Sequence, residues 1–524
     1  MEIPHESLPT DLSLCHEMIR ELLKKVEQSH FMIEKLTHQV EHLLKARYGP
    51  RADRIDPNQE LLFQELLQQL DTPLQRQEPP KEEKRPLESK PAKRGHGRKP
   101  LPAHLPRKRI EHDLDPADRV CEQCGEEKAM IGLEKSEQLE YVPASFVVLE
   151  HVFPKYACKQ CVDGVVTADR PSRPIEKGLP GPGLLAQVTT SKYSDHLPLA
   201  RQENIFKRHG VEIARSTQCD WMRAGAELLL PLYDRMKEEI LSSKVIQTDD
   251  TPVPVRDKDL PKTRTGRLWV YRGDDAHPYT VYDYTASRKR DGPVNFLSDF
   301  SGYLQADAYG GYDGIYATKA VKEVACWAHA RRKFVDAQST DSGRAVNAVA
   351  RIRLLYDVEE TAKDQTPEER HALRQEKSKP ILDAFESWLQ EEQRTVLPKS
   401  PMGQAIAYTL ANWKALTRYT EDGDLSIDNN ASERALRPIA IGRKNWMHCG
   451  SDRGGETAAV LYSFTQSAKR HGLDPFEYLR DVFDRISDIS MSRLDELLPD
   501  RWKAIRQAEP SGVHDRLPTT DSPI

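Results

Sequence analysis

The chain has 524 residues, of which 30% are charged and 38% are hydrophobic, and its formal net charge is −5. This length suggests three or four domains, and the composition is typical of a soluble protein. A membrane protein is excluded because no stretch approaches the roughly 20 apolar residues that span a bilayer, and the N-terminus has no signal-peptide features. We therefore expect a cytoplasmic protein. The net charge does not indicate nucleic-acid binding, so local charge matters more than the total.

The first predicted element is a coiled coil within residues 1–71. From Leu12 to Leu43 the apolar positions advance in alternating steps of three and four, with mainly β-branched residues at one core position and leucine at the other. This combination favours parallel two-stranded coils and so predicts a homodimer or higher oligomer. Cys15 and Ser29 interrupt the pattern. An amphipathic helix that packs on its own protein is the alternative.

Residues 72–112 form a Pro-rich basic linker. Between Lys81 and Arg109 there are eleven Lys or Arg and three Glu, a local charge of +8. The segment is either a solvated tether or an arm that contacts DNA. Its glycines would let the backbone lie close to a narrow minor groove. The candidate DNA contacts are Arg94, Arg98 and Lys99.

Two Cys-x-x-Cys pairs, 33 residues apart, lie in the segment 113–172. Four thiolates match a closed tetrahedral Zn²⁺ site of the structural kind, whereas a catalytic zinc needs an open position. The gap exceeds the usual spacing, but two predicted strands, 138–142 and 146–152, would fold back and bring the pairs together. Unmetallated cysteines are the alternative. The predicted Zn²⁺ ligands are Cys121, Cys124, Cys158 and Cys161.

The segment 173–240 has a helical pattern. A helix, a glycine-containing turn and a second helix opened by Ser216 or Thr217 match the outline of a helix-turn-helix. The second helix would contain Gln218 and Arg223 and would read DNA. Many helical hairpins share this outline, so a purely structural hairpin is the alternative. The candidate DNA contacts are Arg215, Ser216 and Thr217.

In residues 241–450, strand-like and turn-like segments alternate before a long helical stretch. The order of elements predicts an α/β layer with mixed strand directions. Residues from about 338 to 425 predict an inserted helical region, and residues 451–524 a C-terminal helical domain and tail. The expected strands are 245–248, 268–271, 279–284, 303–306 and 324–327, with a short helix at 294–300.

Three acids in this region suit a metal site. Asp249 ends the first predicted strand, Asp307 ends the fourth, and Glu433 lies in a helix-like segment. Mg²⁺ binds carboxylate oxygens together with substrate phosphates, so the set is typical of a site that cuts phosphodiesters. Taken alone, such aspartates are more commonly solvated turn residues, and Asp250 is an equal candidate for the ligand.

Together these residues resemble the large transposase of the insertion sequence 66 family of bacterial mobile elements. The resemblance covers most of the chain, because that family also has an N-terminal coil, a linker, a zinc segment and a short C-terminal domain. Asp250 stands where the family commonly has Glu, next to the presumed ligand. The motifs that carry the resemblance are residues 249–253 (Asp-Asp-Thr-Pro-Val), 305–312, 326–334 and 428–438, which continues through 442–446.

The resemblance implies a ribonuclease-H-like fold with a DDE triad of Asp249, Asp307 and Glu433 and a helical insertion between the second and third acids. It also implies two Mg²⁺ ions roughly 3.5 to 4 Å apart, with Asp249 bridging both. Water would cut the element end, and the exposed 3′-hydroxyl would then attack target DNA. The implied partners are the terminal repeats, the target DNA and small accessory proteins of the element. A DNA-bound protein would be associated with the nucleoid.

Other candidates flank the acids. Cys326 and His329 form either a second metal site or, as we favour, a packing and positioning pair. Glu456 is the rival of Glu433, although its neighbouring glycines indicate a turn. Basic residues nearby would hold DNA phosphates or, alternatively, form surface salt bridges: Arg331, Arg332, Arg437, Arg443 and Lys444.

Two other functional classes remain open. A zinc-containing DNA-binding regulator would keep its function after loss of all three acids. A catalytically inactive relic of a transposase would bind element ends without cutting them. Metal-dependent cleavage separates the enzyme from both, whereas salt-dependent DNA binding alone does not.

Overall fold

The computed structural model describes residues 146–151, 155–157, 165–167, 171–176, 178–257, 260–317 and 320–508, together with Arg20 and Lys25. The chain divides into two units, residues 72–154 and the remainder. The rest of the predicted coil, the basic linker and the four cysteines predicted to bind zinc lie outside the described residues. No helix in the described part of the chain is both long and apolar enough to cross a membrane.

The predicted strand over residues 146–152 is not found in its described part, 146–151, which has no regular secondary structure. Val148 is 92% exposed there. An alternating apolar pattern forms a strand only where a neighbour pairs with it and one face is buried, and this segment has no buried face. Two short antiparallel strands, β1 (Lys155–Ala157) and β2 (Val165–Thr167), instead flank the second Cys-x-x-Cys pair in the sequence.

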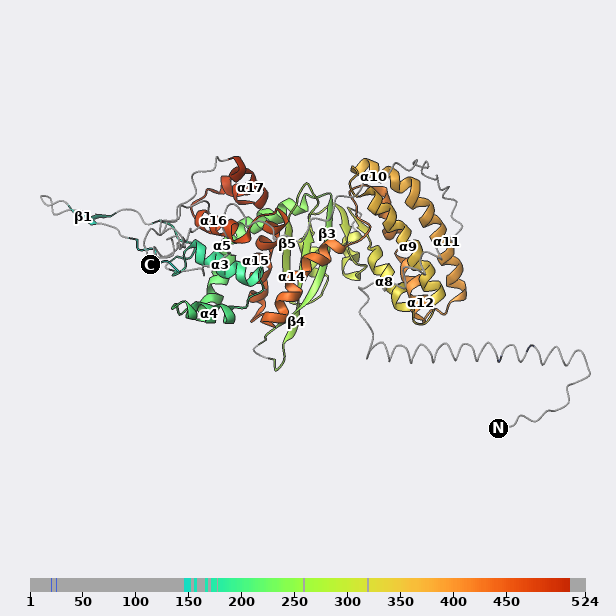
Figure 1. Ribbon diagram of the computed structural model, residues 1–524, viewed down its shortest axis with the longest axis horizontal. Coiled ribbons are helices and arrows are strands. Elements are labelled where there is room, and N and C mark those ends of the chain that lie inside the picture. Colours follow the sequence, from blue (N-terminus) through green and yellow to red (C-terminus); the bar gives the residue numbers. More distant parts are fainter. Residues whose placement is uncertain are drawn as a thin grey trace, which may run out of the picture. The chain divides into compact units, whose positions relative to one another are not determined.

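The chain forms a five-stranded mixed sheet (Figure 1) with strand order β5-β4-β3-β6-β7, and Asp249 lies in its central strand. Strands β3 and β5 each run antiparallel to β4, which lies between them, and β6 and β7 run parallel to β3. The predicted order of strands, with helix α6 (Asp291–Phe296) after the third, is found, and the topology is consistent with a ribonuclease-H-like core. The strands are β3 (Val245–Val255), β4 (Arg264–Arg272), β5 (Thr280–Thr285), β6 (Gly302–Gln305) and β7 (Val321–Val324).

Strand β3 is longer than the sequence predicts, so the expectation that Asp249 ends it is wrong. β3 pairs with β6 only as far as Gln247, because β6 stops at Gln305, but it continues to Val255 along β4. Pro252 has no N–H to donate and is tolerated because one edge of β3 has no strand neighbour there. Asp249 therefore lies within a strand, just past the end of its parallel neighbour.

Two long helices cover one side of the sheet. α14 (Asn430–Trp446) packs on β3 and β4, and α15 (Asp452–Arg470) packs on β4 and β5. α15 also supplies hydrogen bonds to the outer edge of β5: the Ser467 hydroxyl accepts the N–H of Thr280 at 3.0 Å, and that of Ser463 accepts the N–H of Tyr282 at 2.8 Å. The edge strand is thereby closed to further pairing.

The segment predicted as a helix-turn-helix forms a hairpin of helices that packs on α15. Its second helix, α5, begins at Arg215, after Ala214, so the expectation that Ser216 or Thr217 opens the helix is wrong by one or two residues. Gly210 in the turn has a φ of +77°, a conformation that glycine adopts without strain. The remaining helices of this layer follow α15 or pack on α3. The layer comprises α3 (Pro182–Tyr193), α4 (Leu199–Arg208), α5 (Arg215–Leu241), α16 (Pro475–Arg485), the 3₁₀ helix η5 (Met491–Leu497) and α17 (Pro499–Ala508).

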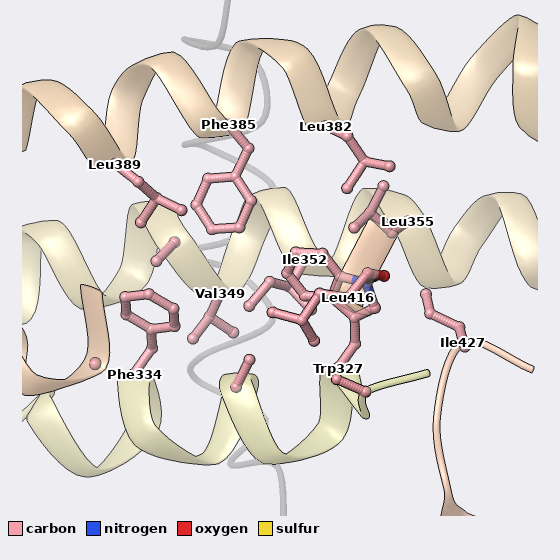
Figure 2. Packing of buried hydrophobic residues seen from close by; sticks show 14 of the residues in the cluster. Trp327, Phe334, Val349, Ile352, Leu355, Leu382, Phe385, Leu389, Leu416 and Ile427 are labelled. Atoms are coloured by element: carbon pink, nitrogen blue, oxygen red, sulfur yellow. Dashed lines mark hydrogen bonds between the residues drawn. The ribbon is translucent and has the colours of Figure 1, made fainter. Parts of the chain in front are cut away.

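The predicted insertion is a helical bundle with its own apolar core (Figure 2). Trp327 and Phe334 of α8 meet Phe385 of α11 in this core, and all three side chains are fully buried. The Trp327 indole N–H donates to the carbonyl of Leu416 at 2.8 Å. The helices are α8 (Trp327–Ala337), α9 (Ser342–Ala362), α10 (Pro367–Leu373), the π-helical turn η3 (Arg374–Ser378), α11 (Lys379–Thr395), α12 (Pro401–Ala411), α13 (Trp413–Thr417) and the 3₁₀ turn η4 (Arg418–Glu421).

Arg374 fixes the segment by which the chain returns from the insertion to the sheet. Its side chain is 1% exposed and makes two hydrogen bonds to the Glu359 carboxylate, of 2.8 and 2.6 Å. The other donors reach the carbonyls of Tyr419, Asp422 and Leu425 at 2.8 to 2.9 Å. The five N–H groups of the guanidinium are thus satisfied, and the chain leading to α14 is held in one path.

Candidate active site

Asp249 and Asp307 come from neighbouring parallel strands. Gln247 of β3 lies opposite Gln305 of β6, and the Gln247 amide donates to the Gln305 amide oxygen at 3.1 Å. Asp249 and Asp307 each follow two residues later, so both lie at the same end of this strand pair. Because alternate residues of a strand share a face, Asp249 lies on the face of Gln247. The register of β3 and β6 therefore brings the two acids together.

Glu433 reaches the same place from the first turn of α14. The residue before the helix, Asn429, is fully buried, and its side-chain amide donates to the carbonyl of Thr248 at 2.8 Å. Its backbone N–H donates to Sγ of Cys326 at 3.2 Å. These bonds attach the start of α14 to β3 and to the start of α8. Glu433 lies one turn further along the helix and interacts electrostatically with Asp249.

Burial and mutual repulsion disfavour the charged forms of these acids. The pKa of Asp249 is raised to about 7, mainly by burial and also by the neighbouring carboxylates of Asp307, Asp250 and Glu433. The hydrogen bond from the backbone N–H of Asp250 opposes this rise. Burial also raises the pKa of Asp307, although His329 and Arg288 oppose that shift. Such an arrangement gains stability when a cation enters it.

The donor set fits a hard divalent cation. The Glu433 Oε1 atom is buried and makes no hydrogen bond, and the nearest base, His329 Nε2, is 3.6 Å away. A buried carboxylate oxygen without a hydrogen bond is available as the kind of ligand that Mg²⁺ prefers. Among the described residues, no three His, Cys, Asp or Glu side chains are already spaced to hold one ion. Asp249, Asp307 and Glu433 would therefore have to rotate toward a shared ion.

Asp250 points away from this set, and strand alternation explains why. It pairs with Trp269, on the opposite face from Asp249. Its side chain is 3% exposed and accepts hydrogen bonds from Arg267 at 2.8 Å and from Arg288 at 2.9 and 3.1 Å. The alternative that Asp250 is the ligand is disfavoured because two arginines already occupy its oxygens.

Three further residues were candidates from the sequence: Cys326, His329 and Glu456. Burial raises the pKa of the Cys326 thiol to about 12, and its sulfur accepts an N–H, which supports the packing interpretation. His329 lies beside Glu433. Glu456 lies instead on α15 near Asp283 of β5, where burial, with a smaller contribution from Glu456, raises the pKa of Asp283 to about 6. This position supports Glu433 as the third acid.

The basic residues predicted to hold DNA phosphates differ in their exposure and in their partners. Arg443 donates to the Thr251 hydroxyl at 3.2 Å and to the carbonyl of Pro252, which ties it to β3 next to the acid pair. Arg437 and Lys444 are exposed and lie on the Glu433 side of α14, one and three turns further along. Arg332 is exposed on α8, and Arg331 interacts with Tyr356.

The predicted recognition helix is only partly free to contact DNA. Arg215 and Ser216 are exposed and Thr217 is half-buried. Gln218, which the predicted recognition helix contains, is fully buried and donates to the carbonyl of Ile213 at 3.1 Å, so its side chain is not available to DNA. Arg223 is exposed but paired with Asp220 at 3.3 Å.

Two residues with structural roles at the site were missed from the sequence. Asn429 anchors α14 to β3 through its side chain, which makes no capping hydrogen bond to the helix, so the Asp-Asn-Asn triplet, typical of a helix start, gave no signal for this contact. Arg288 bridges Asp250 and Asp307, with its Nη2 atom 3.9 Å from Asp307 Oδ2. The only sequence signal for Arg288 is a basic turn after a strand, which is common on solvated surfaces.

Four protein-family models match the chain. The model of the Transposase IS66 family covers residues 177–457, which contain all three acids. A zinc-finger binding domain of transposase IS66 matches residues 118–162, with all four paired cysteines. An IS66 C-terminal element matches residues 463–499, and a leucine-zipper model, described as Transposase C of IS166 homeodomain, matches residues 35–110.

Three relatives from Sinorhizobium fredii, each described as an uncharacterized protein, are similar over most of the chain. The protein y4jD is 34% identical over 96% of this chain and 99% of its own length. The protein y4hP is 35% identical over 78% and 77% of the two lengths, and y4qI is 36% identical over 92% and 91%. The similarity thus extends through nearly the whole sequence.

Proposed function

We propose that this chain, which belongs to the IS66 family of transposases, cuts the ends of an insertion element and joins them to target DNA through Asp249, Asp307 and Glu433. The observation that carries the proposal is the convergence of these carboxylates, which come from β3, from the end of β6 and from α14. No other set of acids in the described residues combines burial, mutual repulsion and a buried oxygen without a hydrogen bond in this way.

The three carboxylates would hold Mg²⁺, in keeping with the preference of that ion for oxygen ligands. Bound Mg²⁺ would stabilise charge on the attacking and leaving oxygens of an in-line displacement. Because the pKa of Asp249 is about 7, that side chain carries a proton part of the time at neutral pH and must lose it to act as a ligand. His329, 3.6 Å from Glu433, would orient that carboxylate.

DNA choice would lie in other segments. The four cysteines Cys121, Cys124, Cys158 and Cys161 would hold a structural Zn²⁺ ion within the zinc-finger match. The linker residues Arg94, Arg98 and Lys99 and the start of α5, Arg215 to Thr217, would contact the DNA backbone. The leucine-zipper match supports self-association. Five basic residues would hold DNA phosphates near the acids: Arg331, Arg332, Arg437, Arg443 and Lys444.

The test uses the full chain and a linear duplex that carries the cognate element ends. Wild type with Mg²⁺ should release the flanking DNA and leave a free 3′-hydroxyl, and a chelator should stop the reaction. Asp249→Asn and Glu433→Gln should each lower the cleavage rate by roughly a thousandfold or more, the scale on which groups that stabilise developing charge act. Both variants should still bind the duplex.

Glu456→Gln is the matched control, because Glu456 is exposed and lies outside the site. It should cleave at the wild-type rate. Wild-type cleavage by Asp249→Asn would contradict the assignment. If the wild-type chain binds the element ends but never cuts them, the protein is an inactive relic of a transposase. If a variant without all three acids still regulates in the absence of Mg²⁺, the protein is a DNA-binding regulator.

A further inference from the structure

A basic hollow lies at the surface next to Asp307. Three of its lining side chains are cations and one is an acid, so it carries positive charge next to a strongly negative site. It is formed by the turn after β5 and the segment that follows Asp307. Its lining residues are Arg288, Lys289, Arg290, Asp291, Tyr309, Gly310 and Gly311.

Arg288 is held rigidly at the junction between this basic hollow and the acids. Its guanidinium makes hydrogen bonds of 2.9 and 3.1 Å to Asp250 and lies 3.9 Å from Asp307. It also stacks over the Tyr309 ring, 4.0 Å from the centroid, and the Tyr309 hydroxyl donates to the Arg288 carbonyl. A Cβ at Gly311 would lie 2.1 Å from the Tyr309 ring, so glycine is needed for this close approach. The hollow is therefore built by packing and is not a loose turn.

Lys289 and Arg290 are exposed and, within the described ranges, make no side-chain hydrogen bond or ion pair. Arg267 and Arg288, by contrast, are both paired with Asp250. Exposed basic pairs are often only solvated, but this pair lines a hollow that borders Asp307 through Arg288, and the carboxylates at the site repel a DNA backbone. A cation at that position offsets the repulsion for an approaching phosphate.

We propose that this basic hollow binds a backbone phosphate of the DNA strand that is cut, within a few nucleotides of the reacting phosphodiester. Lys289 and Arg290 supply charge-assisted hydrogen bonds to the phosphate oxygens, and Arg288 sets the boundary between that phosphate and Asp307. The inference rests on the proposed function, since it takes the substrate to be DNA. It adds a substrate-positioning subsite that the acids themselves do not provide.

The test combines a double variant with DNA that lacks one charge. Lys289→Ala/Arg290→Ala is compared with wild type on element-end duplexes in which a single phosphate, moved stepwise along the cut strand, is a neutral methylphosphonate. Wild-type affinity should fall roughly tenfold at one position near the cut, the scale of one charge-assisted hydrogen bond. The double variant should lose a similar factor on unmodified DNA and nothing more at that position. The slope of its log affinity against log salt concentration should be shallower than that of wild type by the amount expected for about one phosphate contact.

Arg394→Ala/Lys399→Ala is the matched control, because it removes the same charge from exposed positions on the helical insertion. It should keep the wild-type sensitivity at every position. Two results would overturn the inference. One is a double variant whose loss of affinity adds to the methylphosphonate loss at every position, and the other is a double variant that loses no more affinity than the control. Since affinity is read separately from cleavage, failure to cleave would count against the proposed function alone.

Discussion

Two of the sites where the described residues bury charge, the helical insertion and the sheet, treat that charge in opposite ways. In the helical insertion, Arg374 is 1% exposed and its donors reach Glu359 and three carbonyl oxygens. At the sheet, Asp249 and Glu433 lie close together, the pKa of Asp249 is raised to about 7, and Oε1 of Glu433 makes no hydrogen bond. The first arrangement is electrostatically complete and the second is not.

The difference indicates what each region contributes. A fully paired buried charge holds a segment in one path, and Arg374 holds the residues that lead to α14 and so to Glu433. A set of repelling carboxylates lowers stability and is retained where a ligand will complete it. The insertion thus holds the chain that leads to Glu433 in place, and the carboxylates at the sheet are suited to bind a cation.

Breaking the complete arrangement should have the largest effect on stability. Arg374→Met should lower the free energy of unfolding by about 3 to 5 kcal/mol, because it leaves the partly buried Glu359 carboxylate and three backbone carbonyls without their partner. Urea-induced unfolding followed by circular dichroism measures the change. Arg374→Met with Glu359→Leu should recover much of the loss, since no buried charge remains. A single variant within about 1 kcal/mol of wild type would contradict the role given to this pair.

Removing the charge of Asp249 should raise the free energy of unfolding, which is the opposite of the effect at Arg374. The folded-state pKa of Asp249, about 7, lies above its unfolded value, so ionisation of this group opposes folding. Its penalty is small near pH 4, grows as pH rises toward 7 and is constant above that. In metal-free buffer, Asp249→Asn should therefore be more stable than wild type by up to about 4 kcal/mol at pH 8, with the difference shrinking at lower pH.

Thermal unfolding between pH 4 and pH 8, in the presence of a chelator, measures this difference. Asp364→Asn, at an exposed position of the insertion, is the control and should match wild type throughout. An Asp249→Asn variant that is less stable than wild type at pH 8 would show that the carboxylate stabilises the fold, against the comparison drawn above.

The smallest expected effect separates stability from activity. Ser400 caps α12 by accepting the N–H of Gly403 at 3.0 Å, far from the acids in the sequence. Ser400→Ala should lower stability by about 1 kcal/mol through loss of that cap and leave cleavage unchanged. Differential scanning calorimetry and the cleavage assay measure the two quantities. A large loss of cleavage would show that the insertion is coupled to the site more tightly than its packing indicates.

Local sequence signals determined much of this protein. The apolar strand patterns located four of the five strands, whereas the fifth was predicted at 324–327 and forms at Val321–Val324, with helix α8 beginning at Trp327. The motif around residues 428–438 located the helix that carries Glu433, because backbone preference and apolar alternation act over a few residues. The cysteine pairs and the basic linker were equally visible in the sequence, and the family matches at residues 118–162 and 35–110 agree with a zinc-finger and a leucine-zipper segment.

The family resemblance already favoured Asp249 over Asp250, but only the tertiary structure shows the physical reason. Whether Asp249 or Asp250 joins Asp307 depends on strand register, since a shift of one residue exchanges the two faces. That Asn429 attaches α14 to β3, and that Arg288 lies between Asp250 and Asp307, depends on contacts between residues far apart in the chain. Such contacts have no local periodicity, so only the packed fold reveals them.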